Sequence, residues 1–226
     1  MTKQTAIPDS LFTFLKDLSQ NNHRDWFQKN KDRHDTARTE FKAFAETLFN
    51  EMSKIDEVEE FKVFRIYRDV RFSKNKTPYK TCFSGYIKRS TKWRRGGYYF
   101  HIEPDNTFAG GGFWEPNAPD LRRIRQEIAA DDKPLRKIIN SASFKKNFGT
   151  LDGNQLKTAP RGYAKDHPAV DLLRYKQFLV NKPFTEAQAL DKSFAKEMVK
   201  AFKAMLPLFD YMSEVLTTDA NGVPIE

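Results

Sequence analysis

Hydrophobic side chains recur with two different periods along the chain. Near both ends they return every three or four residues, a spacing typical of amphipathic helices. This spacing predicts a first helix that ends before Asn21, a second that begins at Arg24, and a third that runs to about Lys54. It also predicts a C-terminal helix over 193–216, which Pro207 should kink or divide.

The period changes to two in the middle of the chain, as in strands that are buried on one face. Strands are therefore expected over 64–72, 81–88 and 97–103, and a returning strand is expected to begin at 107–109. The sequence thus predicts an α+β fold, in which an antiparallel β-sheet core of about four to six strands is covered by N-terminal and C-terminal α-helices.

Length and composition favour one well-buried core. The chain has 226 residues, 14% of them aromatic, and shows neither an internal repeat nor a clear interdomain linker. We therefore expect a single domain over 1–226, with 1–6 and 217–226 loosely held.

Compartment signals indicate a cytoplasmic protein without a membrane partner. The sequence has no apolar run of about 18 residues, the length that a transmembrane helix needs. Its first ten residues lack the apolar centre of a signal peptide. Cys82 is the only cysteine, which excludes an internal disulfide and fits a reducing compartment.

The expected strand 64–72 carries three arginines and one aspartate. Strand alternation places Arg68 on its apolar face, where a guanidinium group needs a carboxylate or carbonyl partner. The opposite face groups Arg65, Asp69 and Arg71. The sequence therefore predicts that Arg68 is buried and paired, and that Asp69 orients an arginine rather than performing chemistry.

Positive charge is concentrated around this strand. Segment 61–98 holds twelve lysines and arginines against one acid, a net charge of +11, whereas the whole chain carries +9. Concentrated charge favours a binding site over a device for solubility. Guanidinium groups bind phosphate or carboxylate in a bidentate manner, so we expect a phosphate-bearing or other anionic ligand. The candidate ligand-binding residues are Arg65, Arg68, Asp69, Arg71, Lys76, Tyr79, Trp93 and Tyr99.

Two alternatives to simple anion binding remain open at this strand and its neighbour. The arginines can belong to a structural ion-pair network in a protein–protein interaction module. Alternatively, His101 and Glu103, which share one face of segment 97–103, can act as an acid–base pair on a phosphoester-type substrate. His-x-Glu supplies only two metal ligands and the remaining histidines lack ligand spacing, so neither a metal nor another cofactor is expected.

A second basic segment, 88–95 (KRSTKWRR), interleaves Trp93 with five cations. Cations neutralise phosphates and aromatic rings stack on bases, so this segment favours a nucleic-acid partner, beside the anionic small molecule proposed above. A solvated hairpin loop is the alternative.

The triple glycine at 110–112 precedes a helix that Asn117 should cap. It lacks the phosphate-binding lysine of a P-loop, so we interpret it as a bulge that lets Trp114 pack closely.

The central motif is Arg-x-x-Arg-Asp-x-Arg-Phe-x-x-x-Lys-x-x-Tyr, formed here by Arg65, Arg68, Asp69, Arg71, Phe72, Lys76 and Tyr79. This motif resembles the uncharacterised, mainly bacterial family called domain of unknown function 2461, which also has fungal members. Further similar segments are 21–22, 26–27, 30–31, 99–104, 110–112, 161–163 and 166–168. The resemblance covers nearly the full length. It implies a single-domain protein and supplies no activity.

Overall fold

Five strands form one sheet in the order β1-β2-β3-β4-β5, with antiparallel neighbours. The computed structural model describes residues 4–90, 92–219, 223 and 224. The strands are β1 (Val58–Val63), β2 (Phe83–Arg89), β3 (Gly97–Ile102), β4 (Thr107–Phe113) and β5 (Phe178–Phe184). Helices at both ends of the chain flank the sheet, which confirms the predicted α+β fold.

Nine helices accompany the sheet within the described residues. In chain order they are α1 (Asp9–Gln20), α2 (Arg24–Lys29), α3 (Lys31–Met52), α4 (Ala118–Ala130), α5 (Lys133–Ile139), α6 (Ala142–Phe148), α7 (Val170–Leu173), α8 (Glu186–Leu190) and α9 (Phe194–Thr217). Pro207 lies inside α9 and does not divide it, contrary to one of the two outcomes predicted. None of the helices in this part of the chain is both long enough and apolar enough to cross a membrane.

The chain forms two compact units. Unit 1 consists of Met1–Ile87, Tyr99–Ala109 and Pro183–Lys200, and unit 2 consists of Lys88–Tyr98, Gly110–Lys182 and Ala201–Glu226. The single-domain organisation therefore stays a prediction. The expected loose ends fall partly on 1–3, 220–222, 225 and 226, which lie outside the described residues.

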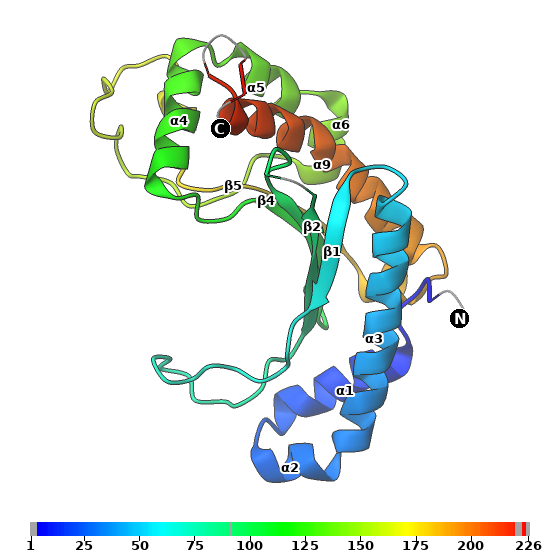
Figure 1. The fold of residues 1–226 in the computed structure, drawn as a ribbon. Helices are drawn as coiled ribbons and strands as arrows, with labels where there is room; N and C mark the ends of the chain where they lie inside the picture. Colours follow the sequence, from blue (N-terminus) through cyan, green and yellow to red (C-terminus); the bar gives the residue numbers. More distant parts are fainter. Residues whose placement is uncertain (1–3, 91, 220–222, 225–226) are drawn as a thin grey trace. The chain divides into compact units, whose positions relative to one another are not determined.

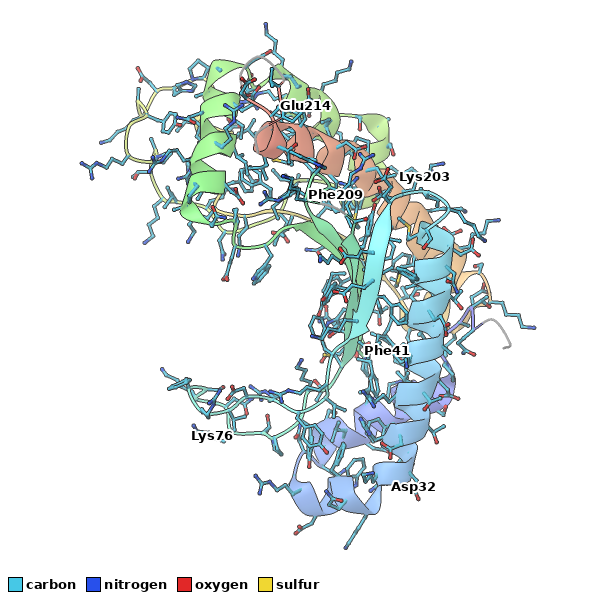
Figure 2. All side chains as sticks on the ribbon, in the orientation of Figure 1. Asp32, Phe41, Lys76, Lys203, Phe209 and Glu214 are labelled. Carbon is cyan, nitrogen blue, oxygen red and sulfur yellow. The ribbon has the colours of Figure 1, made fainter. Side chains whose placement is uncertain are left out.

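The core of unit 1 lies between α3 and one face of the sheet. The ring of Phe41 in α3 has its centroid 5.5 Å from that of Phe83 and 5.6 Å from that of Phe100. Figure 2 shows Phe41 between the helix and the sheet. Phe44, one helical turn further, stacks on Phe194 with centroids 5.4 Å apart. The apolar stripe read from the sequence thus forms the buried face of α3.

The core of unit 2 is built on α9. Tyr98 has its ring centroid 5.1 Å from that of Phe202 and 5.2 Å from that of Phe209, and all three side chains are fully buried. Helix α4 begins as predicted, because the side chain of Asn117 accepts a hydrogen bond from the backbone N–H of Asp120 at 2.8 Å.

The triple glycine belongs to β4 and is not a bulge for Trp114, whose side chain is 68% exposed. At Gly112 the backbone φ is +129°, and a Cβ there would lie 2.1 Å from the carbonyl oxygen of Phe178. A Cβ on Gly111 would lie 2.8 Å from Sδ of Met205. The glycines therefore allow β4 to approach its neighbours closely, and our interpretation from the sequence was wrong.

The strand predicted over 64–72 was also wrong. The strand β1 ends at Val63, and the chain then leaves the sheet until β2 begins at Phe83. Alternation in 64–72 does not reflect burial on one face, because Phe72 is 96% exposed whereas Ile66 is 4% exposed. The three other predicted strands overlap β2, β3 and β4.

Candidate functional site

Residues 64–82, which we call the basic arm, connect β1 to β2 within unit 1. The arm contains six lysines and arginines and one acid, Asp69, which gives it a net charge of +5. Figure 1 shows it leaving the sheet on the side away from α3. Nearly half of the +11 charge of segment 61–98 is therefore carried by a projecting loop rather than by a strand.

The two halves of the arm are paired near its base. The backbone N–H of Arg68 donates to the carbonyl of Pro78 at 2.9 Å, and that of Lys80 donates to the carbonyl of Ile66 at 2.8 Å. An antiparallel bridge joins Tyr67 and Tyr79 between them. These contacts give the arm a hairpin-like base without making it part of the sheet.

Tyr79 anchors the arm to the N-terminal helices. Its ring stacks on that of Phe27 in α2, with centroids 4.0 Å apart and planes inclined by 14°. The side-chain amide of Asn22 donates to the carbonyl of Tyr79 at 3.0 Å and accepts from its N–H at 3.1 Å. Only 3% of Tyr79 is exposed, so the structure gives this predicted ligand-binding residue a supporting position.

Arg68 stabilises the arm from within. Its guanidinium group donates to the hydroxyl and the carbonyl of Thr77, the latter at 3.4 Å, and to the hydroxyl of Ser73 at 3.5 Å. The side chain is half-buried, and these partners are neutral oxygens of the arm itself. Arg68 is therefore paired, with a carbonyl among its partners as predicted, but it is half-buried rather than buried because the predicted strand does not form.

Lys76, like Arg68, donates hydrogen bonds to oxygens of the arm itself. Its ammonium group donates to the carbonyl of Val70 at 2.9 Å and to that of Arg71 at 3.4 Å. Figure 2 shows Lys76 on the arm, away from the helices of unit 1. Lys76 thus closes the end of the arm while its charge remains exposed.

Arg65, Asp69 and Arg71 come together on the exposed surface of the arm, as the sequence predicted. Asp69 accepts from Nη2 of Arg71 at 2.6 Å and from its Nε at 3.0 Å. Hydrogen bonds from Arg71, and then the charge of Arg65, hold the pKa of Asp69 below its ordinary value. The pKa of Arg71 is raised by the same hydrogen bonds. Asp69 therefore remains a carboxylate that positions Arg71.

Phe72 occupies the outer part of the arm with 96% of its surface exposed. The guanidinium carbon of Arg71 lies 5.9 Å from the centroid of its ring. Sequence reasoning placed Phe72 on a buried strand face and so omitted it from the candidate site. Its position among the cations of the central motif was the signal that could have identified it.

A second polar cluster lies on the face of the sheet opposite α3. The hydroxyl of Tyr99 is 3.1 Å from Nδ1 of His101, and Nε2 of His101 is 3.0 Å from Oε2 of Glu103. Glu103 also accepts from Thr81 at 2.6 Å and from Asn106 at 2.9 Å. A carboxylate only accepts, so the singly protonated imidazole carries its proton on Nε2 and accepts from Tyr99. We call these three residues the Tyr99–His101–Glu103 chain.

Burial and hydrogen bonding set the protonation states around this chain. Burial raises the pKa of Glu103, but hydrogen bonds from Thr81, Asn106 and His101 outweigh it and leave the pKa below its ordinary value. Burial raises the pKa of Tyr99. It also raises the pKa of Cys82 to about 11, so this thiol is a poor nucleophile.

The base of the arm adjoins this chain. The ring centroid of Phe64 lies 6.4 Å from that of Tyr99, and the ammonium group of Lys80 lies 5.4 Å from the ring of Phe64. His101 stacks on Phe108 with centroids 4.9 Å apart. Lys80 was missed by sequence reasoning because it lies just outside the central motif. Among the residues that the structure describes, no group of three or more His, Cys, Asp and Glu side chains is placed to hold a metal ion.

The basic segment 88–95 includes Arg89, which is fully buried in unit 2. The guanidinium group of Arg89 donates to Asp210 at 2.7 Å and to the carbonyl of Arg95 at 3.1 Å. Arg89 therefore occupies the buried, paired position that the sequence analysis gave to Arg68.

Other cations of this segment also face carboxylates. Arg95 forms an ion pair with Asp120, and Arg94 lies 3.6 Å from Asp210. Trp93 is 38% exposed, with the ammonium group of Lys92 4.5 Å from its ring. Residue 91 lies outside the described residues. Ion pairing accounts for at least three of the five cations, and nucleic-acid binding by this segment stays a prediction.

The comparisons with known proteins identify a family. Residues 10–211 match the family described as "Conserved hypothetical protein (DUF2461)". The matched segment contains the whole basic arm and the Tyr99–His101–Glu103 chain. Comparisons with curated proteins and with solved structures found no significant match. Because the family match covers most of its 226 residues, this chain belongs to the DUF2461 family.

Proposed function

We propose that the protein binds a phosphate-bearing or other anionic ligand through the basic arm. The observation that carries the proposal is the pair of exposed arginines, Arg65 and Arg71, on a segment whose only acid is Asp69. Guanidinium groups are suited to phosphate because they donate several parallel hydrogen bonds.

The local geometry leaves donors for such a ligand. The hydrogen bonds from Arg71 to Asp69 use Nε and Nη2. Within the described residues, no hydrogen bond is found for Nη1 of Arg71 or for the guanidinium group of Arg65. Solvent and salt screen an exposed ion pair such as Arg71–Asp69, so a phosphate group can share Arg71 with Asp69 at little cost.

Titration calorimetry at low ionic strength with inorganic phosphate and pyrophosphate tests this proposal. The arm variant is Arg65→Gln/Arg71→Gln, and the matched control is Lys192→Gln/Lys196→Gln, which removes two exposed cations elsewhere in unit 1. We expect the arm variant to bind at least about tenfold more weakly, because charge-assisted hydrogen bonds are lost. The control should change affinity little. Equal affinity of wild type and arm variant would contradict the proposal.

A second candidate function is acid–base chemistry on a phosphoester, favoured by the Tyr99–His101–Glu103 chain. Tyr99 and Glu103 occupy both ring nitrogens of His101, so His101 exchanges a proton with a substrate through the hydroxyl of Tyr99 or after that side chain moves. Hydrolysis of p-nitrophenyl phosphate, a monoester, and of bis(p-nitrophenyl) phosphate, a diester, tests for turnover. His101→Asn should abolish turnover and leave anion affinity within severalfold. Turnover that survives in His101→Asn would exclude this role.

The proposal includes a cytoplasmic location. Cys82, the only cysteine, has no cysteine partner within its own chain, as is usual in a reducing compartment. Localisation of a fluorescent fusion at native expression level checks this part of the proposal, and accumulation outside the cytoplasm would refute it.

A further inference from the structure

The exposure of Phe72 calls for an explanation. Burying a phenylalanine side chain is favourable by about 1.5–3 kcal/mol, and the other phenylalanines of the described residues are buried or half-buried. Phe72, at 96% exposure, is the one phenylalanine there that is not. Its ring therefore contributes little packing to the folded chain.

The surroundings of Phe72 are cationic and held in place. Arg71 lies beside its ring and is fixed by Asp69, while Lys76 is fixed by two backbone carbonyls. Lys74 is exposed on the same turn. An exposed aromatic ring between positioned cations is the combination that binds single-stranded nucleic acids, because cations neutralise phosphates and the ring stacks on a base.

We infer that the ligand of the basic arm is a single-stranded nucleic acid with one base stacked on Phe72, an inference that rests on the proposed anion binding by the same arm. A duplex fits less well because its bases already stack on one another. A membrane surface also fits less well. Anchoring there grows with buried apolar area, and Ser73, Lys74 and Asn75 follow Phe72 directly.

The test compares two probes that carry the same phosphates. One is an oligothymidylate about 12 nucleotides long, and the other is an abasic oligonucleotide of equal length. Fluorescence anisotropy at low salt gives the affinity of each. Wild type should bind the oligothymidylate more tightly, because only that probe offers bases for stacking.

Substitutions at Phe72 separate stacking from simple hydrophobic contact. Phe72→Leu should weaken oligothymidylate binding by roughly 5- to 150-fold and leave the abasic probe unchanged, because leucine is apolar but has no π-face. Phe72→Trp should retain the affinity. Trp114→Leu, which removes another exposed aromatic ring, is the matched control and should have no effect. The exposure of Phe72 makes these variants neutral for folding.

Salt dependence tests the electrostatic part of the inference. The affinity for both probes should fall linearly with salt on a log–log plot. In Arg65→Gln/Arg71→Gln the slope should be smaller by about 1.4, because each phosphate contact in a single strand contributes about 0.7. An unchanged slope would remove these arginines from the binding site.

The outcomes distinguish this inference from the anion-binding proposal. If both probes bind equally and Phe72→Leu changes neither affinity, the stacking inference is wrong and anion binding stands. The same holds if pyrophosphate binds and neither probe does. Binding to phosphatidylserine vesicles that Phe72→Leu retains, without binding to oligothymidylate, would replace the nucleic acid by a membrane. If phosphate, pyrophosphate, both probes and vesicles all fail to bind, both proposals are overturned.

Discussion

The ring of Tyr79 stacks on the ring of Phe27 with the two centroids 4.0 Å apart. This contact joins the base of the basic arm to α2 and lies beside two hydrogen bonds between Asn22 and the backbone of Tyr79. The side-chain amide of Asn22 thus satisfies both backbone groups of Tyr79, as a neighbouring strand would in a sheet. The arm is fixed at its base although it leaves the sheet.

Removing this amide should loosen the arm. We expect Asn22→Ala to lower the free energy of unfolding by about 1–2 kcal/mol, because both backbone groups of Tyr79 lose their partner. Hydrogen exchange at the Tyr79 amide should accelerate. Asn22→Asp, which keeps the acceptor and loses the donor, should have a smaller effect on that amide. Unchanged exchange in Asn22→Ala would show that stacking on Phe27 suffices.

Two arginines of the central region should differ in their contribution to stability. Arg89→Met should cost about 3 kcal/mol, because its fully buried guanidinium group donates to Asp210, to Ser213 and to the carbonyl of Arg95, and these hydrogen bonds are lost. Arg68→Met should cost about 1 kcal/mol, because it removes only hydrogen bonds to neutral oxygens of the arm. Urea denaturation of both variants measures the two losses of unfolding free energy. A larger loss in Arg68→Met than in Arg89→Met would contradict these assignments.

Stability should fall at mildly acidic pH because of His34. Burial lowers the pKa of His34, against the raising effect of the hydrogen bond that its Nδ1 donates to Asp35, and Nε2 of the ring has no partner among the described residues. The unfolded chain then binds a proton at higher pH than the native chain. The contribution of neutral His34 to the free energy of unfolding is therefore complete above about pH 6.5. It is lost as the pH falls below that value, and the free energy of unfolding then changes by at most about 1.4 kcal/mol per pH unit.

Denaturation of wild type and His34→Leu across this pH range checks the assignment. As the pH falls below about 6.5, the free energy of unfolding of wild type should decrease relative to that of His34→Leu. A difference that is constant with pH would assign the acid sensitivity to other groups.

Substitutions at two glycines should separate steric from conformational effects. Gly112→Ala should cost roughly 3 kcal/mol or more, because its Cβ would overlap the carbonyl oxygen of Phe178 and its φ is +129°. Gly162→Ala should cost only about 1–2 kcal/mol, because φ is +93° but no atom lies within 4 Å of the added Cβ. Thermal unfolding of both variants measures the difference. Equal costs would mean that backbone strain alone is responsible.

Local patterns in the sequence were sufficient for the fold class and for part of the candidate site. The stripe of α3 and the cap at Asn117 follow from short-range spacing, and the structure contains both. His101 and Glu103 share a strand face and are hydrogen-bonded, as alternation implied. The grouping of Arg65, Asp69 and Arg71 came from the wrong secondary structure, because residues separated by two or four positions also meet in a tight loop.

The remaining errors concern contacts between distant segments. Arg89 lies 121 positions before its partner Asp210, so no local pattern reveals that the two residues pair. Arg89 does share the alternation of Phe83 and Ile87 in β2, and this was the available signal for its burial. The exposure of Phe72 is equally non-local, since it depends on the arm leaving the sheet.

Arg68 and Lys76 build the arm with donors directed at neutral oxygens. Ionic strength weakens interactions between charges far more than hydrogen bonds to neutral groups. If the arm binds an anion as proposed, rising salt should therefore release the anion without unfolding the arm, and rebinding should need no refolding step. Ionic strength would then control binding of the proposed ligand, whereas the conformation of the arm would stay the same.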